Sequence, residues 1–201
     1  MLSPRLTRRP FVRAALKFIA IVISVAPCAF AHAGDDVSFD AVTGYRIAHY
    51  RAAVPATVPG GTRVDRDRVD QLLEDGAVLL DVMPSEGAGA DSQTGAWRLS
   101  RPHQSIPGAT WLPDVGRGVL TARFDDYLRT NVAKLSGGDT NKALIVFCQS
   151  DCWMGWNAVQ RIAKLGYTNI FWFPEGTDGW VEWGDRKLQP IDPVPVSAAA
   201  P

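Results

Sequence analysis

The sequence predicts an α/β fold with a mainly parallel central sheet. Three short apolar runs at 77–83, 143–147 and 170–173 have the length of buried strands. They alternate with amphipathic stretches that show helical spacing, and this alternation is typical of a parallel sheet covered by helices. A hydrophobic content of 46% in 201 residues is enough to fill the core of one such domain.

The first half of the domain begins with a short helix. Asp65 or Asp67 can cap it, Val69, Leu72 and Leu73 share one face, and Gly76 ends it. The strand at 77–83 follows. Residues 84–118 are rich in Gly, Pro, Ser and Asp, and a loop this long is usually functional or ordered by its own side chains. Within it, residues 105–113 have the Pro-Gly turn and the apolar content of a segment that returns to the core.

The second half begins with a helix over 121–135. Phe124, Leu128, Val132 and Leu135 repeat at helical spacing, and Gly137-Gly138 ends the helix. The strand at 143–147 runs directly into Cys148, a helix is expected over 155–165, and the third strand follows at 170–173. We therefore place the domain at 62–186, after a polar N-terminal extension at 34–61. The Pro- and Ala-rich segment 187–201 is expected to be a disordered tail.

Residues 1–33 have the features of a signal peptide. Five basic residues precede or open the apolar run 18–26, and Ala31-His32-Ala33 predicts cleavage before Gly34. The run is too short for a comfortable membrane span, so we expect no stable membrane insertion after cleavage, with an uncleaved anchor as the alternative. Thr7-Arg8-Arg9-Pro10-Phe11 resembles the twin-arginine export motif, and the general export route is the alternative. Export predicts the periplasm as the location.

The charge balance argues against polyanionic partners. The whole chain has 21 basic and 21 acidic residues, and removal of 1–33 leaves 16 basic against 21 acidic. We therefore expect no nucleic acid as a partner. Cleavage also removes Cys28 and leaves only Cys148 and Cys152. In an oxidising compartment such a close pair is often a disulfide or a redox couple.

The chemistry is predicted to lie at this cysteine pair. Sites in open parallel sheets form at the carboxyl ends of strands, where Cys148 stands. The N–H groups at the start of the next helix would favour a thiolate and lower its pKa. Cys152 is close enough in sequence for a disulfide. A disulfide across so short a loop contributes little stability, which favours a redox or sulfur-handling pair over a structural one. The loop and pocket residues are Gln149, Ser150, Asp151, Trp153, Met154, Gly155 and Trp156.

Several motifs together resemble the rhodanese-like domain over residues 62–184. They are Leu80-Asp-Val82, Ile106-Pro-Gly-Ala109, the loop that opens at Cys148, and Gly176-Thr-Asp-Gly-Trp180. The resemblance implies a three-layer sandwich and a persulfide-forming Cys148. The segment 147–157 further resembles a small rhodanese-like family named for its CXXCW motif and associated with pyrroloquinoline-quinone (PQQ)-dependent alcohol catabolism. That second resemblance implies a quinoprotein dehydrogenase or its cytochrome as a partner.

The loop also departs from the rhodanese pattern. The family usually has Gly three residues after the cysteine and Arg five residues after it, whereas this chain has Asp151 and Trp153. No Lys or Arg lies between Cys148 and Asn157. A dianion such as thiosulfate needs a nearby cation, so ordinary thiosulfate:cyanide transfer and phosphate chemistry are not expected. The pair suggests instead that Cys148 attacks a small thiol, a persulfide or a protein thiol, and that Cys152 resolves the adduct.

Two residues outside the loop are supporting candidates. His103 lies close to the Ile-Pro-Gly turn, so it is a ligand or base near Cys148 or a surface loop residue. Asp81 ends a strand and is expected to hydrogen-bond loop backbone rather than to act in catalysis. No cofactor is expected, although a Cys-x-x-x-Cys pair with one His is also a ligand set for copper. The alternative to an enzyme is a non-catalytic module that binds a partner or Cu(I).

Overall fold

The computed structural model describes residues 38–87 and 89–197. The predicted signal peptide lies outside the described residues, so its cleavage, the export route and the periplasmic location stay predictions.

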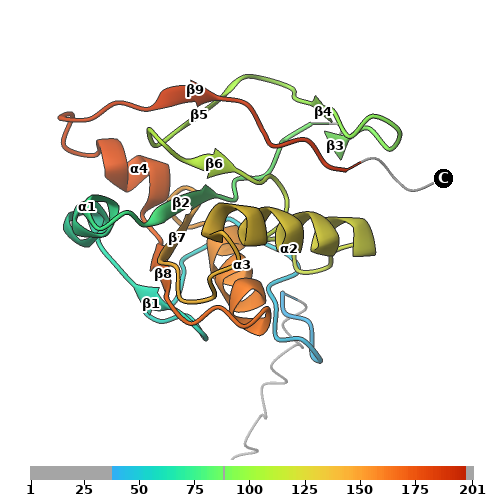
Figure 1. The fold of residues 1–201 in the computed structure, drawn as a ribbon, viewed down its shortest axis with the longest axis horizontal. Coiled ribbons are helices and arrows are strands. Elements are labelled where there is room, and N and C mark those ends of the chain that lie inside the picture. The colour runs from blue at the N-terminus through green and yellow to red at the C-terminus, as the bar shows by residue number, and fades with distance from the viewer. Residues whose placement is uncertain (1–37, 88, 198–201) are drawn as a thin grey trace, which may run out of the picture. The chain divides into compact units, whose positions relative to one another are not determined.

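The described chain forms nine strands and four helices, shown in Figure 1. The strands are β1 (Thr62–Arg63), β2 (Val78–Asp81), β3 (Gly89–Ala90), β4 (Trp97–Arg98), β5 (His103–Ser105), β6 (Thr110–Trp111), β7 (Leu144–Phe147), β8 (Ile170–Phe173) and β9 (Gln189–Ile191). The helices are α1 (Arg66–Glu74), α2 (Ala122–Ser136), α3 (Trp153–Lys164) and α4 (Gly176–Val181).

The central sheet has five strands in the order β1-β8-β7-β2-β6, and all of its pairings are parallel. β7 lies at its centre, where all four residues are buried. This confirms the predicted fold class. The carboxyl ends of the five parallel strands lie on the same side of the sheet. Cys148 follows the carboxyl end of β7 and therefore lies in the middle of that side.

Helices cover both faces of this sheet because its side chains alternate between two cores. Leu80, Val146 and Trp172 pack with α2 and α3 on one face, whereas Ile145 and Phe173 pack with α1 and α4 on the other. The structure is thus a three-layer α/β/α sandwich.

Two helix ends form as their sequences predict. Asp65, rather than Asp67, caps α1, and its carboxylate accepts a hydrogen bond from Arg68 N at 2.9 Å. Gly137 ends α2 in the left-handed conformation that favours glycine. Because these local signals coincide with the apolar faces, both helices lie within one residue of their predicted bounds.

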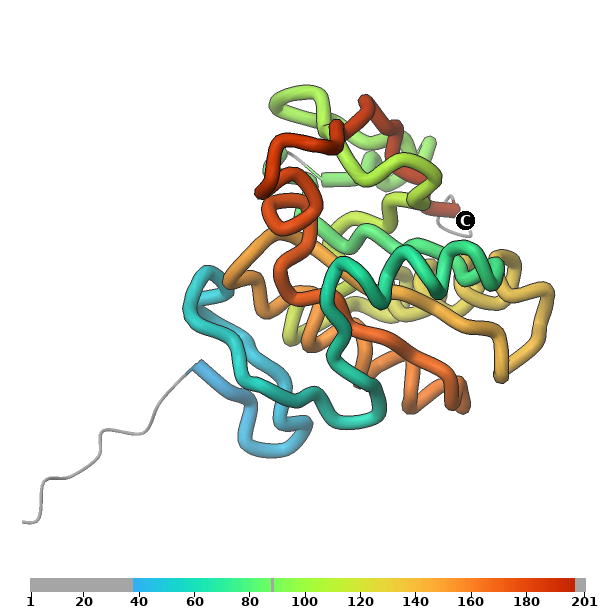
Figure 2. The backbone as a smooth tube through the Cα atoms, turned by 90° about the vertical axis from the view of Figure 1, so that its left-hand side faces the viewer, coloured from blue at the N-terminus to red at the C-terminus, as the bar shows by residue number. Residues whose placement is uncertain are grey.

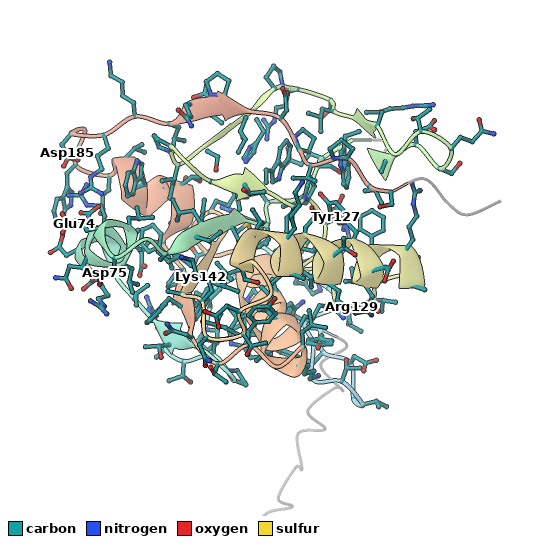
Figure 3. All side chains as sticks on the ribbon, viewed as in Figure 1. Glu74, Asp75, Tyr127, Arg129, Lys142 and Asp185 are labelled. Carbon is teal, nitrogen blue, oxygen red and sulfur yellow. A yellow bond between two sulfur atoms is a disulfide. The ribbon has the colours of Figure 1, made fainter. Side chains whose placement is uncertain are left out.

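The C-terminal segment differs from its prediction. Residues 187–197 are ordered: β9 pairs with β5, and Val196 is buried. Val194 O accepts hydrogen bonds from Tyr127 Oη and from Trp97 Nε1, both at 2.8 Å. Figure 3 shows Tyr127 on the side of α2 that faces this segment. The expected disorder is therefore wrong for 187–197, because these contacts are long-range and leave no periodic pattern in a Pro-rich sequence.

Within the described residues, no helix is long and apolar enough to cross a membrane.

Candidate functional site

The cysteine loop connects the central strand β7 to α3. Cys148 follows Phe147 directly, and the helix begins at Trp153 with Cys152 as its N-cap. The expected helix start at 155 is therefore two residues late. Cys152, rather than Cys148, occupies the cap position, where a side chain can accept hydrogen bonds from the free N–H groups of the first turn. In the disulfide form Cys152 makes no such bond.

The two cysteines form a disulfide, with their Cα atoms 6.2 Å apart. Both are buried: Cys148 is 2% exposed and Cys152 is 3% exposed. Because the closed loop is so short, a disulfide here is expected to stabilise the fold by only about 2 kcal/mol.

Asp151 lies between the cysteines in a left-handed backbone conformation. Its φ is +53°, a region that Asp adopts more readily than most residues other than glycine, at a cost of about 1–2 kcal/mol. The carbonyl of Asp151 accepts a hydrogen bond from Ala52 N at 3.0 Å.

The start of α4 holds the Cys148 side of the loop. Thr177 N donates to Cys148 O at 3.0 Å, and Gln149 forms a β-bridge with Gly176. A Cβ atom on Gly176 would lie 2.3 Å from Cys148 O, so this close approach requires glycine.

Two acidic residues lie beside the exposed Ser150. Ser150 N donates to the carboxylate of Asp178 at 3.1 Å, and Ser150 Oγ donates to the backbone carbonyl of Glu175 at 3.0 Å. The carboxylate of Glu175 forms an ion pair with Arg63 at 2.6 Å. The carboxylates of Asp151 and Asp178 therefore lie in or beside the loop without a cation of the loop itself.

The remaining loop residues begin α3 and face the inside of the molecule. Met154 is fully buried, and a Cβ on Gly155 would lie 3.0 Å from the indole nitrogen of Trp172. Trp153 and Trp156 pack edge to face, 5.1 Å between ring centroids. The predicted loop and pocket residues are thus brought together, but as a packed wall around the disulfide.

The N-terminal extension covers the other side of the loop, a feature that the sequence did not indicate. We call residues 38–57 the strap. Figure 2 shows this blue-to-cyan segment beside the start of the orange α3. Arg51 forms an antiparallel bridge with Cys152, and Trp153 N donates to Tyr50 O at 2.9 Å. A short, non-periodic segment far away in sequence carries no signal of such a contact.

Asp81 and His103 form a cluster at the end of β2, where Asp81 pairs with Phe147, the residue before Cys148. Asp81 is fully buried and its carboxylate accepts hydrogen bonds from Ser105 Oγ at 2.5 Å and Met83 N at 2.8 Å. His103 Nε2 lies 2.7 Å from the same carboxylate, and its ring packs on Trp111 at a tilt of 43°, with centroids 4.1 Å apart. These contacts join β2, β5 and β6 to one another.

Two cavities lie near the carboxyl ends of the strands of the central sheet. One of about 270 Å³ is lined by residues of α1 and α4, including Arg66 and Trp183. The other, of about 380 Å³, is lined by Asp114, Arg117 and the start of α2. Neither of these two is lined by Cys148 or Cys152, so neither gives a donor access to the disulfide.

The described residues contain no group of three or more His, Cys, Asp or Glu side chains that could hold a metal ion. The cysteine pair alone offers two sulfur ligands, which suit Cu(I) once the disulfide is reduced.

The chain is thus an α/β domain with a parallel three-layer sandwich and a cysteine loop at the end of its central strand. The model of the rhodanese-like domain matches residues 65–182, more than half of the chain, and the chain therefore belongs to this family. No curated protein matches the chain.

Solved structures resemble the chain more distantly. Thiosulfate sulfurtransferase from Pseudomonas aeruginosa is 20% identical over 70% of this chain and 22% of its own, with a TM-score of 0.43. The polysulfide-sulfur transferase from Wolinella succinogenes is 17% identical over 66% and 80%, with a TM-score of 0.40. A variant of EanB in complex with hercynine is 17% identical over 78% and 37%, with a TM-score of 0.46. The chain spans about a third of the EanB structures, and likenesses this distant support no argument about activity.

Proposed function

We propose that this protein is a rhodanese-like sulfur-handling enzyme in which Cys148 accepts sulfur and Cys152 resolves the adduct. The observation that carries the proposal is the disulfide between these two residues in the loop after β7. It joins the position of the family's nucleophile to a second thiol at the start of α3, so a sulfur bound at Cys148 has a resolving group within reach.

The proposed reaction has two steps. The Cys148 thiolate attacks the outer sulfur of a persulfide R–S–SH, the donor S–S bond breaks, and R–S⁻ leaves. The Cys152 thiolate then attacks Cys148 Sγ, which forms the internal disulfide and releases HS⁻. Two thiols are oxidised, and the transferred sulfur is reduced to hydrosulfide. A small thiol or a protein thiol returns the disulfide to the reduced state.

The electrostatics of the loop favour such a donor over thiosulfate. Asp151 and Asp178 lie in or beside the loop, and the position of the usual Arg is occupied by Trp153, whose ring rather than a substrate faces the guanidinium of Arg46. A persulfide carries at most one negative charge at its reacting end, so it meets less repulsion than a dianion does. We therefore expect thiosulfate to be a poor donor.

The location and the partner complete the proposal. The predicted signal peptide supports a periplasmic location, where an oxidised pair persists. The resemblance of residues 147–157 to the CXXCW family supports a link to PQQ-dependent alcohol catabolism, with a quinoprotein dehydrogenase or its cytochrome as the partner.

Trapping the first adduct tests the assignment of the two roles. In full-length chains that also carry Cys28→Ser, Cys152→Ser should gain about 32 Da at Cys148 when treated with a glutathione persulfide donor. Cys148→Ser should gain nothing at Cys152. Mass spectrometry of intact protein and peptides gives the readout. Sulfur on Cys152 in the second variant, or on neither cysteine, would contradict the proposal.

A second candidate function is a non-catalytic module held by a structural disulfide. The burial of both cysteines, at 2% and 3% exposure, favours it. It predicts a disulfide that resists mild reductant and a reduced protein that accepts no sulfur. The Cu(I) form of this candidate predicts one copper ion bound per reduced pair.

A further inference from the structure

The strap seals the disulfide from one side through its main chain. Ala52 N donates to Asp151 O, and Trp153 N donates to Tyr50 O, so these two bonds flank Cys152. Arg51 lies opposite Cys152 in an antiparallel bridge. The strap thus pairs with loop backbone groups on both sides of Cys152. A change in the conformation of the loop backbone therefore changes the hydrogen bonds that hold the strap.

Side chains of α3 anchor the rest of the strap. Asn157 is fully buried; its Oδ1 accepts from Arg46 N at 2.9 Å and its Nδ2 donates to Arg46 O at 2.8 Å. Trp156 Nε1 donates to Thr57 O at 3.0 Å. The Arg46 guanidinium lies 4.8 Å from the centre of the Trp153 ring, and Phe39 packs edge to face on the same ring.

The opposite side of the loop is held by a helix. There α4 contacts the Cys148 backbone, and α4 itself packs into the core through Trp180. The strap has no helix and only isolated bridges. Segments held by few main-chain bonds open at lower free energy than core elements. A donor molecule therefore reaches the buried pair by opening of the strap.

The disulfide supplies the link between redox state and opening. It closes a ring that contains Asp151, whose φ is +53° and whose carbonyl accepts a hydrogen bond from Ala52 N. When the S–S bond is reduced, the ring opens and Asp151 can relax to the negative φ that non-glycine residues prefer. That rotation turns the carbonyl away from Ala52 and weakens the strap.

We propose that the strap is a redox-coupled cover: the disulfide closes it over the cysteine pair, and reduction releases it through Asp151. This inference deepens the proposed function, on which it rests, by naming how that site is regulated. In the oxidised protein the regenerating thiol reaches the disulfide only through transient openings of the strap, whereas the reduced protein is open to a sulfur donor for more of the time.

Amide hydrogen exchange of the full chain carrying Cys28→Ser tests the cover. Reduction should speed exchange at Ala52 and Trp153 about tenfold, which corresponds to about 1.4 kcal/mol of opening free energy. Amides of β7 and β8 should not change. Equal protection of Ala52 and Trp153 in both redox states would overturn the proposal.

Two variants isolate the coupling. Asp151→Gly accepts positive φ without steric cost, so its strap should stay protected after reduction. The double variant Cys148→Ser/Cys152→Ser should exchange like the reduced parent protein even without reductant. Tenfold loosening of Asp151→Gly on reduction, or a protected strap in the double variant, would overturn the role of Asp151 or of the disulfide.

These measurements use no sulfur donor, so the two hypotheses fail separately. Unchanged exchange in a protein that still traps sulfur at Cys148 refutes only the cover. A strap that loosens in a protein that accepts no sulfur refutes only the proposed enzyme.

Discussion

Asp81 illustrates how a single buried carboxylate can connect several segments at one end of a sheet. Its two oxygens satisfy a loop N–H, a serine hydroxyl and a histidine ring. A buried charge is stable only when it is paired in this way. The sequence predicted hydrogen bonding to loop backbone, which Met83 N confirms, but it could not predict the other two partners because they lie on β5.

Removal of this carboxylate should cost stability and spare reactivity. We expect Asp81→Ala to lower the free energy of unfolding by about 3 kcal/mol, because it leaves Ser105, His103 and Met83 N without their acceptor. Urea unfolding measures the loss, and Asp81→Asn, which keeps one acceptor, should lose less. If folded Asp81→Ala no longer traps sulfur at Cys148, Asp81 belongs to the chemistry after all.

At the scale of elements, α4 and the strap hold the cysteine loop from two sides. The segment Gly176-Thr-Asp-Gly-Trp180 contributed to the family resemblance. Its helix, α4, was not predicted because two glycines disfavour a helix. The close approach of Gly176 to Cys148 O explains why glycine is needed at that point.

A substitution at Gly176 tests this contact. We expect Gly176→Ala to destabilise the protein by about 3 kcal/mol or more, because the added Cβ meets Cys148 O and φ is +53°. Gly137→Ala is the matched control, because its φ of +63° is similar and nothing lies within 4 Å of the added Cβ. The control should lose only about 1–2 kcal/mol. Equal losses in thermal or urea unfolding would show that the contact with the loop has no energetic weight.

At the scale of the whole molecule, the sequence predicted what depends on local periodicity. The three long strands, α1, α2 and the parallel sheet follow from apolar runs and caps. The strap, β9 and the ordered segment 187–197 could not be predicted, because each is ordered by contacts with residues far away in sequence. The strap covers one side of the cysteine loop, so the accessibility of the site could not be predicted from the sequence either.

The same limit applies to the site itself. The sequence predicted the position of the cysteine loop and showed no Lys or Arg within it. It did not indicate that the strap brings Arg46 and Arg51 beside the loop. It placed the helix effect at Cys148, whereas the structure places Cys152 at the N-cap of α3. The prediction was wrong because α3 begins at Trp153, two residues earlier than the apolar pattern indicates.

The central claim is that the molecule couples sulfur acceptance at Cys148 to disulfide formation with Cys152. The most direct measurement is the amount of hydrosulfide released when the reduced protein, carrying Cys28→Ser, is mixed with a small persulfide donor. The account predicts about one hydrosulfide per protein, together with loss of both free thiols, and no release above background from Cys148→Ser. Free thiols that persist, with no hydrosulfide released above that background, would contradict it.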